Sequence, residues 1–149
     1  MNLYLKKVSK ADCDLLFNWA NEALTRKNSF NSERIKYEEH MKWFEKKIKH
    51  KDCFMYIFYE NEIPIGQIRV DLCENIGTIS YDLDKEYRGK GLSKKMIKLL
   101  ENEIHDSYIG INKLVGEVKK ENLPSQKNFE KLKYLKTERD GNLIYYKYI

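Results

Sequence analysis

Three strand-like runs follow one another in the middle of the chain, with only short polar breaks between them. They read CFMYIFY, IPIGQIRVDL and IGTISYDL, and are rich in the β-branched and aromatic residues that favour strands. A glycine turn follows, in the stretch YRGKGLSKKM. After it an apolar stripe recurs at helical spacing, formed by Leu92, Met96, Leu99, Leu100 and Ile104. The sequence therefore predicts neighbouring strands that lead through a glycine turn into an amphipathic helix.

The flanking segments complete a mixed order of elements. LYLKKV, at the start, alternates as a strand does, and two helical patterns follow, one around residues 15–23 and one over 37–48. The polar stretch TRKNSFNSERI between them is predicted to be a loop. Downstream, KLVGEV is predicted to be a strand, NLPSQKNFEKL a capped helix, and the last two strands meet at the Asp-Gly of RDGN. The order β-α-α-β-β-β-α-β-α-β-β predicts one α/β domain over residues 1–149, with a mixed, mainly antiparallel sheet and about four helices.

Composition narrows the class of protein. No run approaches the ~20 apolar residues of a membrane span, and the first residues lack the apolar core of a signal peptide, so we expect a cytoplasmic protein that does not enter the membrane. The three cysteines and three histidines have no metal-ligand or disulfide spacing, so no metal is expected. The net charge is +5, but without a concentrated basic arm, so no nucleic acid partner is expected.

The glycine turn is suited to hold an anion. The first amides of a helix are unpaired and carry about half a positive charge, and glycine lets a phosphate approach the backbone closely. Gly89 and Gly91 lie in such a position, with cations around them. The chain has no P-loop pattern, and Lys94 stands where a dinucleotide fingerprint needs its third glycine. A turn that merely begins a helix remains the alternative at this point.

The stretch YDLDKEYRGKGLSKKMIKLLE resembles the pyrophosphate-binding motif of the GNAT superfamily of N-acetyltransferases. Arg88 and Gly91 match the family pattern, and Ser93 replaces its last small residue. VKKENLPSQKNFEKLKY resembles a later family segment, with Asn122 and Ser125 at the usual spacing and LKY in place of LGF. The resemblance covers essentially the whole chain and implies acetyl-coenzyme A as co-substrate. The cofactor-binding residues it implies are Tyr81, Asp82, Leu83, Arg88, Gly89, Lys90, Gly91, Leu92, Ser93, Lys94, Asn122, Ser125 and Phe129.

The resemblance also raises a question about the catalytic acid. Many family members carry a tyrosine in the late helix, and Phe129 stands at that position here, without a proton to give. Either another group donates the proton or the thiolate leaves unassisted. Glu74 and Tyr81 are the catalytic candidates that we retain, because Glu74 lies near the start of the predicted cofactor strand, where some relatives carry a glutamate base. For the base the sequence leaves open Glu74, Asp71, Tyr81, Asp82 and His40.

The acceptor is predicted to meet the segment between the first two helices. Its polar and aromatic residues are the candidate substrate ligands: Arg26, Asn28, Ser29, Phe30, His40 and Trp43. Arg26 suits a phosphate, and Phe30 or Trp43 suits a base or sugar face. The segment resembles enzymes that acetylate the 4-amino group of UDP-linked amino sugars in the pseudaminic-acid pathway, and less closely those that acetylate ribosomal-protein N-termini. We therefore expect a small amino-sugar nucleotide as acceptor and a monomer or homodimer, with an N-terminal acetyltransferase and a non-catalytic acyl-coenzyme A sensor as alternatives.

Overall fold

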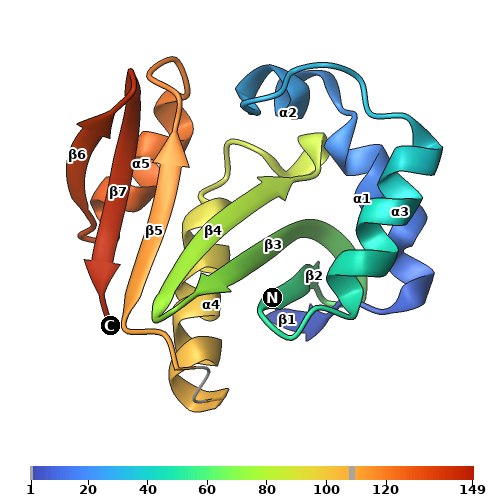
Figure 1. Cartoon of the computed structure of the whole chain (residues 1–149), viewed down its shortest axis with the longest axis horizontal. Coiled ribbons are helices and arrows are strands. Elements are labelled where there is room, and N and C mark those ends of the chain that lie inside the picture. The colour runs from blue at the N-terminus through green and yellow to red at the C-terminus, as the bar shows by residue number, and fades with distance from the viewer. Residues whose placement is uncertain (1, 108–109) are drawn as a thin grey trace.

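A seven-stranded mixed sheet forms the centre of the computed structural model, which describes residues 2–107 and 110–149 (Figure 1). The strands run in the order β1-β2-β3-β4-β5-β7-β6 across the sheet. Their bounds are β1 Leu3–Lys7, β2 Cys53–Glu60, β3 Ile63–Cys73, β4 Ile76–Leu83, β5 Lys113–Val118, β6 Leu135–Arg139 and β7 Asn142–Tyr148. The α-helices of the described residues are α1 Cys13–Ala20, α2 Ala23–Asn28, α3 Tyr37–Ile48, α4 Leu92–Ser107 and α5 Leu123–Lys131, with short 3₁₀ helices η1 at Lys10–Asp12 and η2 at Lys85–Tyr87.

The predicted fold class is confirmed, with one correction. The mixed sheet is antiparallel at every pairing except β4–β5. The Asp140–Gly141 hairpin forms with both residues at positive φ. However, residues 25–28 of the predicted loop belong to α2, so the described residues hold five α-helices where about four were predicted. Glu22 caps α2 by accepting the amide of Leu24 at 3.1 Å through both carboxylate oxygens.

Helices cover the two faces of the sheet unequally. In Figure 1, α1 and α3 lie over the β2–β3 part of one face, whereas α4 and α5 lie on the other. The strand β2 shows why: Tyr56 and Phe58 belong to the core beneath α4, whereas Met55 and Ile57 belong to the core beneath α1 and α3. A strand buried on both faces needs a continuous apolar run, which β2 has. The front of β5, β7 and β6 carries no helix (Figure 1).

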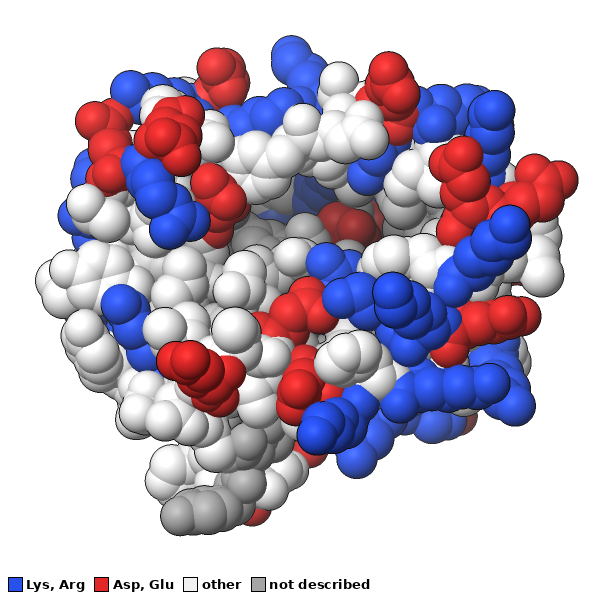
Figure 2. Space-filling model, in the orientation of Figure 1, with Lys and Arg blue, Asp and Glu red and all other residues white. Residues whose placement is uncertain are grey.

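Strands β4 and β5 separate after a short pairing. They are parallel neighbours over three residue pairs only, the last being Thr78 with Val115. Beyond that point Ile79–Leu83 and 116–118 continue without pairing to each other, so the sheet is split there (Figure 1). Figure 2 shows a hollow near the centre of the same view, beneath α2 and at the C-terminal end of β4. We call this opening the β4–β5 cleft.

No helix in the part of the chain that the structure describes is long and apolar enough to cross a membrane. No group of three or more His, Cys, Asp or Glu side chains within residues 2–107 and 110–149 is placed to hold a metal ion. The β4–β5 cleft and the turn that follows β4 form the candidate site.

Candidate active site

The glycine turn joins β4 to α4 at the open end of the cleft. Gly89 and Gly91 both have positive φ, +79° and +75°, which glycine adopts without the cost that other residues incur. No heavy atom lies within 4 Å of where a Cβ would stand at either residue, so the space above this backbone is open. The helix α4 begins at Leu92, directly after the turn. Open space, bare backbone and a helix N-terminus thus coincide at the predicted phosphate site.

The Arg88 side chain is hydrogen-bonded to residues at the start of α2 and not to the glycine turn itself. Its guanidinium donates to Glu22 at 2.9 Å and to Thr25 at 3.2 Å. The hydrogen bond from Arg88 lowers the pKa of Glu22, so the Glu22 carboxylate is ionised around neutral pH. Arg88 therefore fastens the glycine turn to α2, and its backbone rather than its side chain is available to an anion. The neighbours Lys90 and Lys94 remain as side-chain cations, Lys90 exposed and Lys94 half-buried.

A second polar cluster joins β4 to α5. The Tyr81 hydroxyl lies 2.6 Å from the Ser125 hydroxyl and accepts a hydrogen bond from the Asn128 amide at 3.2 Å. Burial raises the pKa of Tyr81, so its proton is retained through the neutral range. Asn122 caps α5 by accepting the amide of Ser125 at 3.3 Å. The predicted pair Tyr81 and Ser125 is therefore brought together, and Asn128 is a member that the sequence reasoning missed.

Phe129 is a core residue in this arrangement, which corrects the prediction that its side chain lines the cofactor site. It is 1% exposed and stacks on Tyr145 with ring centroids 5.4 Å apart. The tip of its ring presses on Gly116 of β5, where a Cβ would collide with it. The edge of the same ring faces Tyr81 at a centroid distance of 6.1 Å. Phe129 thus supports the Tyr81 cluster from behind.

Asp82 points to the opposite face of β4 from Tyr81, because successive residues of a strand alternate. Its Oδ2 accepts a hydrogen bond of 2.9 Å from Gln67, its partner in the β3–β4 register. Its Oδ1 is buried and has no hydrogen-bond partner among the described residues. Burial raises the pKa of Asp82 to about 6, against the opposing effects of Gln67 and of the Arg88, Arg69 and Arg26 charges.

Most of the predicted acceptor ligands hold the protein together instead. Arg26 donates to the backbone oxygens of Ala20, Asn31 and Glu33 and to the Ser29 hydroxyl, at 2.6 to 3.2 Å. These bonds use four of its five N–H donors, which leaves little for a phosphate. The Ser29 hydroxyl also donates to Thr25 O at 2.6 Å. Arg26 and Ser29 are therefore corrected to structural residues that fix the loop after α2.

His40 is likewise corrected. It is 4% exposed, and its Nε2 lies 2.9 Å from the Cys13 carbonyl oxygen, to which it donates. Burial lowers the pKa of His40, so the ring is neutral in this position between α1 and α3. Trp43 is half-buried beneath Arg69, whose guanidinium lies 5.2 Å from its ring centroid. His40 is thus buried away from a substrate, whereas substrate binding by the half-buried Trp43 stays a prediction.

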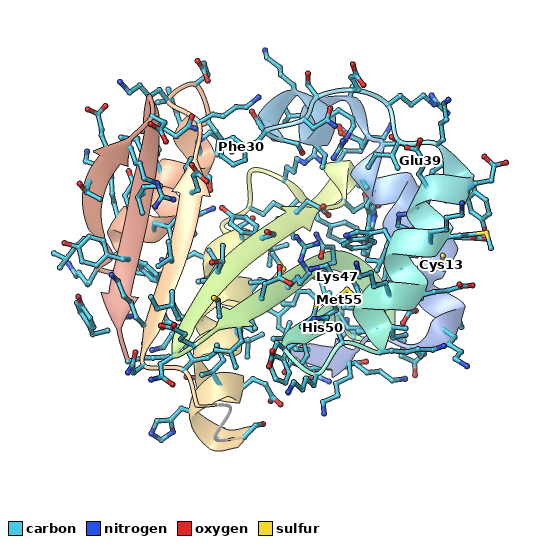
Figure 3. The ribbon with its side chains drawn as sticks, viewed as in Figure 1. Cys13, Phe30, Glu39, Lys47, His50 and Met55 are labelled. Carbon is cyan, nitrogen blue, oxygen red and sulfur yellow. The ribbon has the colours of Figure 1, made fainter. Side chains whose placement is uncertain are left out.

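The other two predicted acceptor ligands, Phe30 and Asn28, lie closer to the cleft. Phe30 is 56% exposed, and in Figure 3 it lies between α2 and the end of β5, above the opening. Lys119, just beyond β5, donates to the backbone oxygen of Lys27 at 3.0 Å. Together with the Arg88 contacts, this bond makes α2 a bridge across the mouth of the cleft, with Asn28 half-buried at its end.

Glu74 is not part of this cluster. It occupies the exposed turn between β3 and β4 with φ of +56°, at the end of β4 where β5 is paired. Six residues separate it from Tyr81, most of them in the extended strand β4, which corresponds to about 20 Å along the chain. The structure therefore separates the two catalytic candidates, and only Tyr81 lies at the cleft.

Comparisons with known proteins agree with this geometry. A family model described as Acetyltransferase (GNAT) domain matches residues 2–134. No curated protein matches the sequence. A solved domain from Methanocaldococcus jannaschii DSM 2661 superposes with a TM-score of 0.86 at 22% identity, over 99% of each chain.

Two further solved structures are similar at lower identity. The aminoglycoside acetyltransferase AAC(6')-Ib, in complex with coenzyme A, has a TM-score of 0.84 at 16% identity, over 99% of this chain and 95% of that chain. RimL, a ribosomal L7/L12 alpha-N-protein acetyltransferase in complex with coenzyme A, has a TM-score of 0.84 at 16% identity, over 100% and 95%. The family model covers most of the sequence and the fold agrees with it throughout, so the chain belongs to the GNAT acetyltransferases and is an acyltransferase that uses acetyl-coenzyme A.

Proposed function

We propose that this acetyltransferase acetylates a primary amine of a small amino sugar and that Tyr81 is its general acid. The observation that carries the proposal is the Tyr81 hydroxyl, held by Ser125 and Asn128 on the wall of the β4–β5 cleft. It supplies the proton donor that Phe129 lacks. The donor reaches the site from β4 instead of α5, and it lies beside the ring of Phe129.

In the proposed reaction the amine attacks acetyl-coenzyme A directly, and Tyr81 on β4 donates the proton to the leaving group. The neutral amine attacks the thioester carbonyl carbon, a C–N bond forms, the nitrogen releases one proton to a base or to solvent, and the C–S bond breaks. The departing thiolate takes the proton of the Tyr81 hydroxyl, and the Tyr81 oxygen is stabilised meanwhile by the hydrogen bonds of its two neighbours. Solvent then restores the proton. No covalent enzyme intermediate is needed, so none of the cysteines has a role in this step.

The bridge formed by α2 favours a small acceptor over a protein terminus. Arg88 holds one side of α2 and Lys119 the other, so the cleft mouth is crossed by a tethered helix. A peptide needs room to extend, whereas a sugar needs a flat apolar surface, which exposed Phe30 offers. AAC(6')-Ib, whose fold this chain shares, was solved with amino-sugar antibiotics such as ribostamycin.

The nucleotide-linked amino sugar remains a candidate within this proposal, but its diphosphate needs a new partner. Arg26, the residue predicted for it, is occupied by backbone oxygens. Arg34 is exposed on the same loop and is the remaining arginine there that could meet a phosphate. Within the described residues Arg34 forms no salt bridge.

The test is a thiol-release assay with acetyl-coenzyme A and three acceptor classes: a UDP-linked 4-amino sugar, an aminoglycoside such as ribostamycin, and short peptides. We expect release with at least one amino sugar and none with peptides. Tyr81→Phe is expected to lower kcat by about 10²-fold or more, because general acid catalysis is typically worth that much. The matched control is Tyr145→Phe, which removes a hydroxyl bonded to Glu130 on the other side of Phe129.

Several results would count against the proposal. Turnover with peptides alone would support the N-terminal acetyltransferase. Tight binding of acetyl-coenzyme A without release of coenzyme A in any mixture would support a non-catalytic sensor. Equal kcat values for Tyr81→Phe and Tyr145→Phe would show that Tyr81 is not the acid.

A further inference from the structure

One carboxylate oxygen beside the cleft lacks the partner that buried polar atoms nearly always have. Asp82 Oδ1 is out of contact with solvent and has no hydrogen-bond partner among the described residues. Such an atom calls for an explanation, because burying an unsatisfied charged group is costly. We infer that Asp82 is the general base of the reaction and that its free Oδ1 receives the acceptor amine; this inference rests on the proposed function.

The carboxylate is held in a fixed orientation. Gln67 donates to Oδ2 at 2.9 Å, and the two residues are opposite each other in the β3–β4 register, so the contact is built into the sheet. Fixing one oxygen leaves the other directed away from Gln67. Gln67 is therefore a positioning residue, since it acts on the amine only through Asp82.

The nearby arginines do not donate a hydrogen bond to Oδ1 of Asp82. Arg26, Arg69 and Arg88 are close enough to stabilise the ionised form of Asp82. Arg26 donates to backbone oxygens and Ser29, Arg69 to Asp71 and Ser80, and Arg88 to Glu22 and Thr25. Each guanidinium thus has its own acceptors and none of them binds Oδ1. No described residue donates to Oδ1, so a hydrogen-bond donor that binds in the cleft could pair with it, and an amine is such a donor.

The position on β4 fits the chemistry. Asp82 lies beyond the last β4–β5 pair, in the part of the strand that borders the cleft. Its neighbour Tyr81 points to the other face of the same strand, where α5 holds its hydroxyl. An acyl group lying in the plane of the split sheet would have Asp82 on one face and Tyr81 on the other. The base and the acid would then act from opposite sides of the thioester.

The proton balance closes with these two residues. When the amine nitrogen bonds to the carbonyl carbon it becomes positively charged and strongly acidic. Asp82 Oδ1 accepts one N–H proton, while the Tyr81 hydroxyl protonates the thiolate as the C–S bond breaks. The products are the amide and the free thiol of coenzyme A, and solvent resets both side chains. A carboxylate that titrates at about 6 is ionised at neutral pH and still a better base than an ordinary aspartate.

The decisive variant is Asp82→Asn, which keeps the shape and the Gln67 contact through its side-chain oxygen. The measurement is the pH profile of kcat/KM with whichever amine the thiol-release screen accepts, together with acetyl-coenzyme A affinity by calorimetry. We expect kcat to fall by about 10²-fold or more and the acidic limb near pH 6 to disappear, with cofactor affinity unchanged. Asp82→Glu is expected to recover part of kcat.

The matched comparison is Asp71→Asn, because Asp71 is another carboxylate that the sequence leaves open as the base. Asp71 is a carboxylate on the same sheet face whose oxygens are already bonded by Lys47 and Arg69, at 2.9 and 2.8 Å. This variant is expected to keep the acidic limb. Gln67→Leu removes the hydrogen bond that lowers the pKa of Asp82, so it is expected to move the acidic limb to higher pH. A purely structural role of Gln67 would not produce this shift.

Two outcomes would overturn the inference: an unaltered pH profile in Asp82→Asn, or a loss of cofactor binding that accounts for all of its lost activity. NMR titration of the Asp82 carboxyl in the free protein separates this inference from the proposed function. If no amino sugar is acetylated, the proposed function fails, whereas an ordinary acidic titration of Asp82 defeats the base assignment with any acceptor.

Discussion

Two substitutions at Gly91 test whether the glycine turn holds the pyrophosphate of acetyl-coenzyme A. They separate the effect of a new negative charge from the effect of backbone strain. Gly91 has φ of +75°, so any side chain there adopts a backbone conformation that costs roughly 1 kcal/mol or more. No heavy atom within 4 Å would meet a new Cβ, so no packing penalty adds to this cost. Asparagine and aspartate are the residues that tolerate this conformation best, and they have the same shape. Gly91→Asn and Gly91→Asp therefore form a pair that differs in charge.

The magnitude follows from where the pyrophosphate is expected to lie. An aspartate carboxylate about 4 Å from one phosphate charge is destabilising by about 4 kcal/mol at the effective dielectric of a protein surface. The turn is exposed, so salt and side-chain rotation reduce this value. We therefore expect acetyl-coenzyme A to bind Gly91→Asp between about tenfold and 10³-fold more weakly than it binds Gly91→Asn.

The assay is isothermal titration calorimetry of acetyl-coenzyme A at low and high salt, with a thermal melt of each apoprotein as the folding control. The Asn and Asp variants should melt at similar temperatures, because both carry the same backbone strain. The affinity gap between them should narrow as salt rises. Equal affinities in two folded variants would refute the reasoning, because the cofactor phosphates would then lie elsewhere.

Three further predictions follow from residues with defined neighbours. Arg26→Ala should lower the free energy of unfolding by about 2 kcal/mol and leave the KM for a sugar nucleotide unchanged, because Arg26 donates to three backbone oxygens; a raised KM in a stable variant would restore it as a phosphate ligand. Phe129→Tyr should lose stability by about 1–3 kcal/mol and gain no activity, because the ring tip presses on Gly116; a faster enzyme would show that the hydroxyl reaches the cleft. Burial raises the pKa of Asp82 from 3.8 to about 6, so ionisation of this side chain lowers the free energy of unfolding. The stability that the protein has with Asp82 protonated, below about pH 4, is therefore partly lost as the pH rises through 6. Asp82→Asn should therefore be more stable than the wild type at about pH 8, by up to about 3 kcal/mol, and the gain should vanish near pH 4; equal melting temperatures at all pH values would contradict this.

Local signals explain which elements could be predicted. The bounds of β4 and β5 agree with the runs IGTISYDL and KLVGEV, and α4 begins where the glycine turn ends. Asn122 and Pro124 mark the start of α5 as the sequence suggests, because a cap and a first-turn proline act within a few residues. The helix α2 was missed because its cap is a glutamate and its last turn is fixed by Arg26, a contact that composition does not reveal.

The contacts of the predicted cofactor and acceptor side chains could not be predicted from the sequence, for a different reason. Arg88 pairs with Glu22 across 66 positions, and His40 with the Cys13 carbonyl across 27. Such partners depend on how helices pack, which no local pattern encodes. The Gln67–Asp82 contact was within reach, by contrast. Counting back from the two-residue turn between β3 and β4 places these residues opposite each other.

Under the proposed mechanism the proton donor comes from β4, whereas α5 carries Phe129 at the position where a tyrosine acid would stand. Gly116 leaves space on β5 into which the ring of Phe129 packs, and Tyr145 stacks on the same ring. Next to Phe129, α5 presents Ser125 and Asn128. The side-chain polar atoms of these two residues need hydrogen-bond partners, which the apolar ring of Phe129 cannot provide. Tyr81 extends from β4 to satisfy both. In the proposed mechanism α5 therefore orients the acid through Ser125 and Asn128, and β4 carries both the Tyr81 hydroxyl and Asp82.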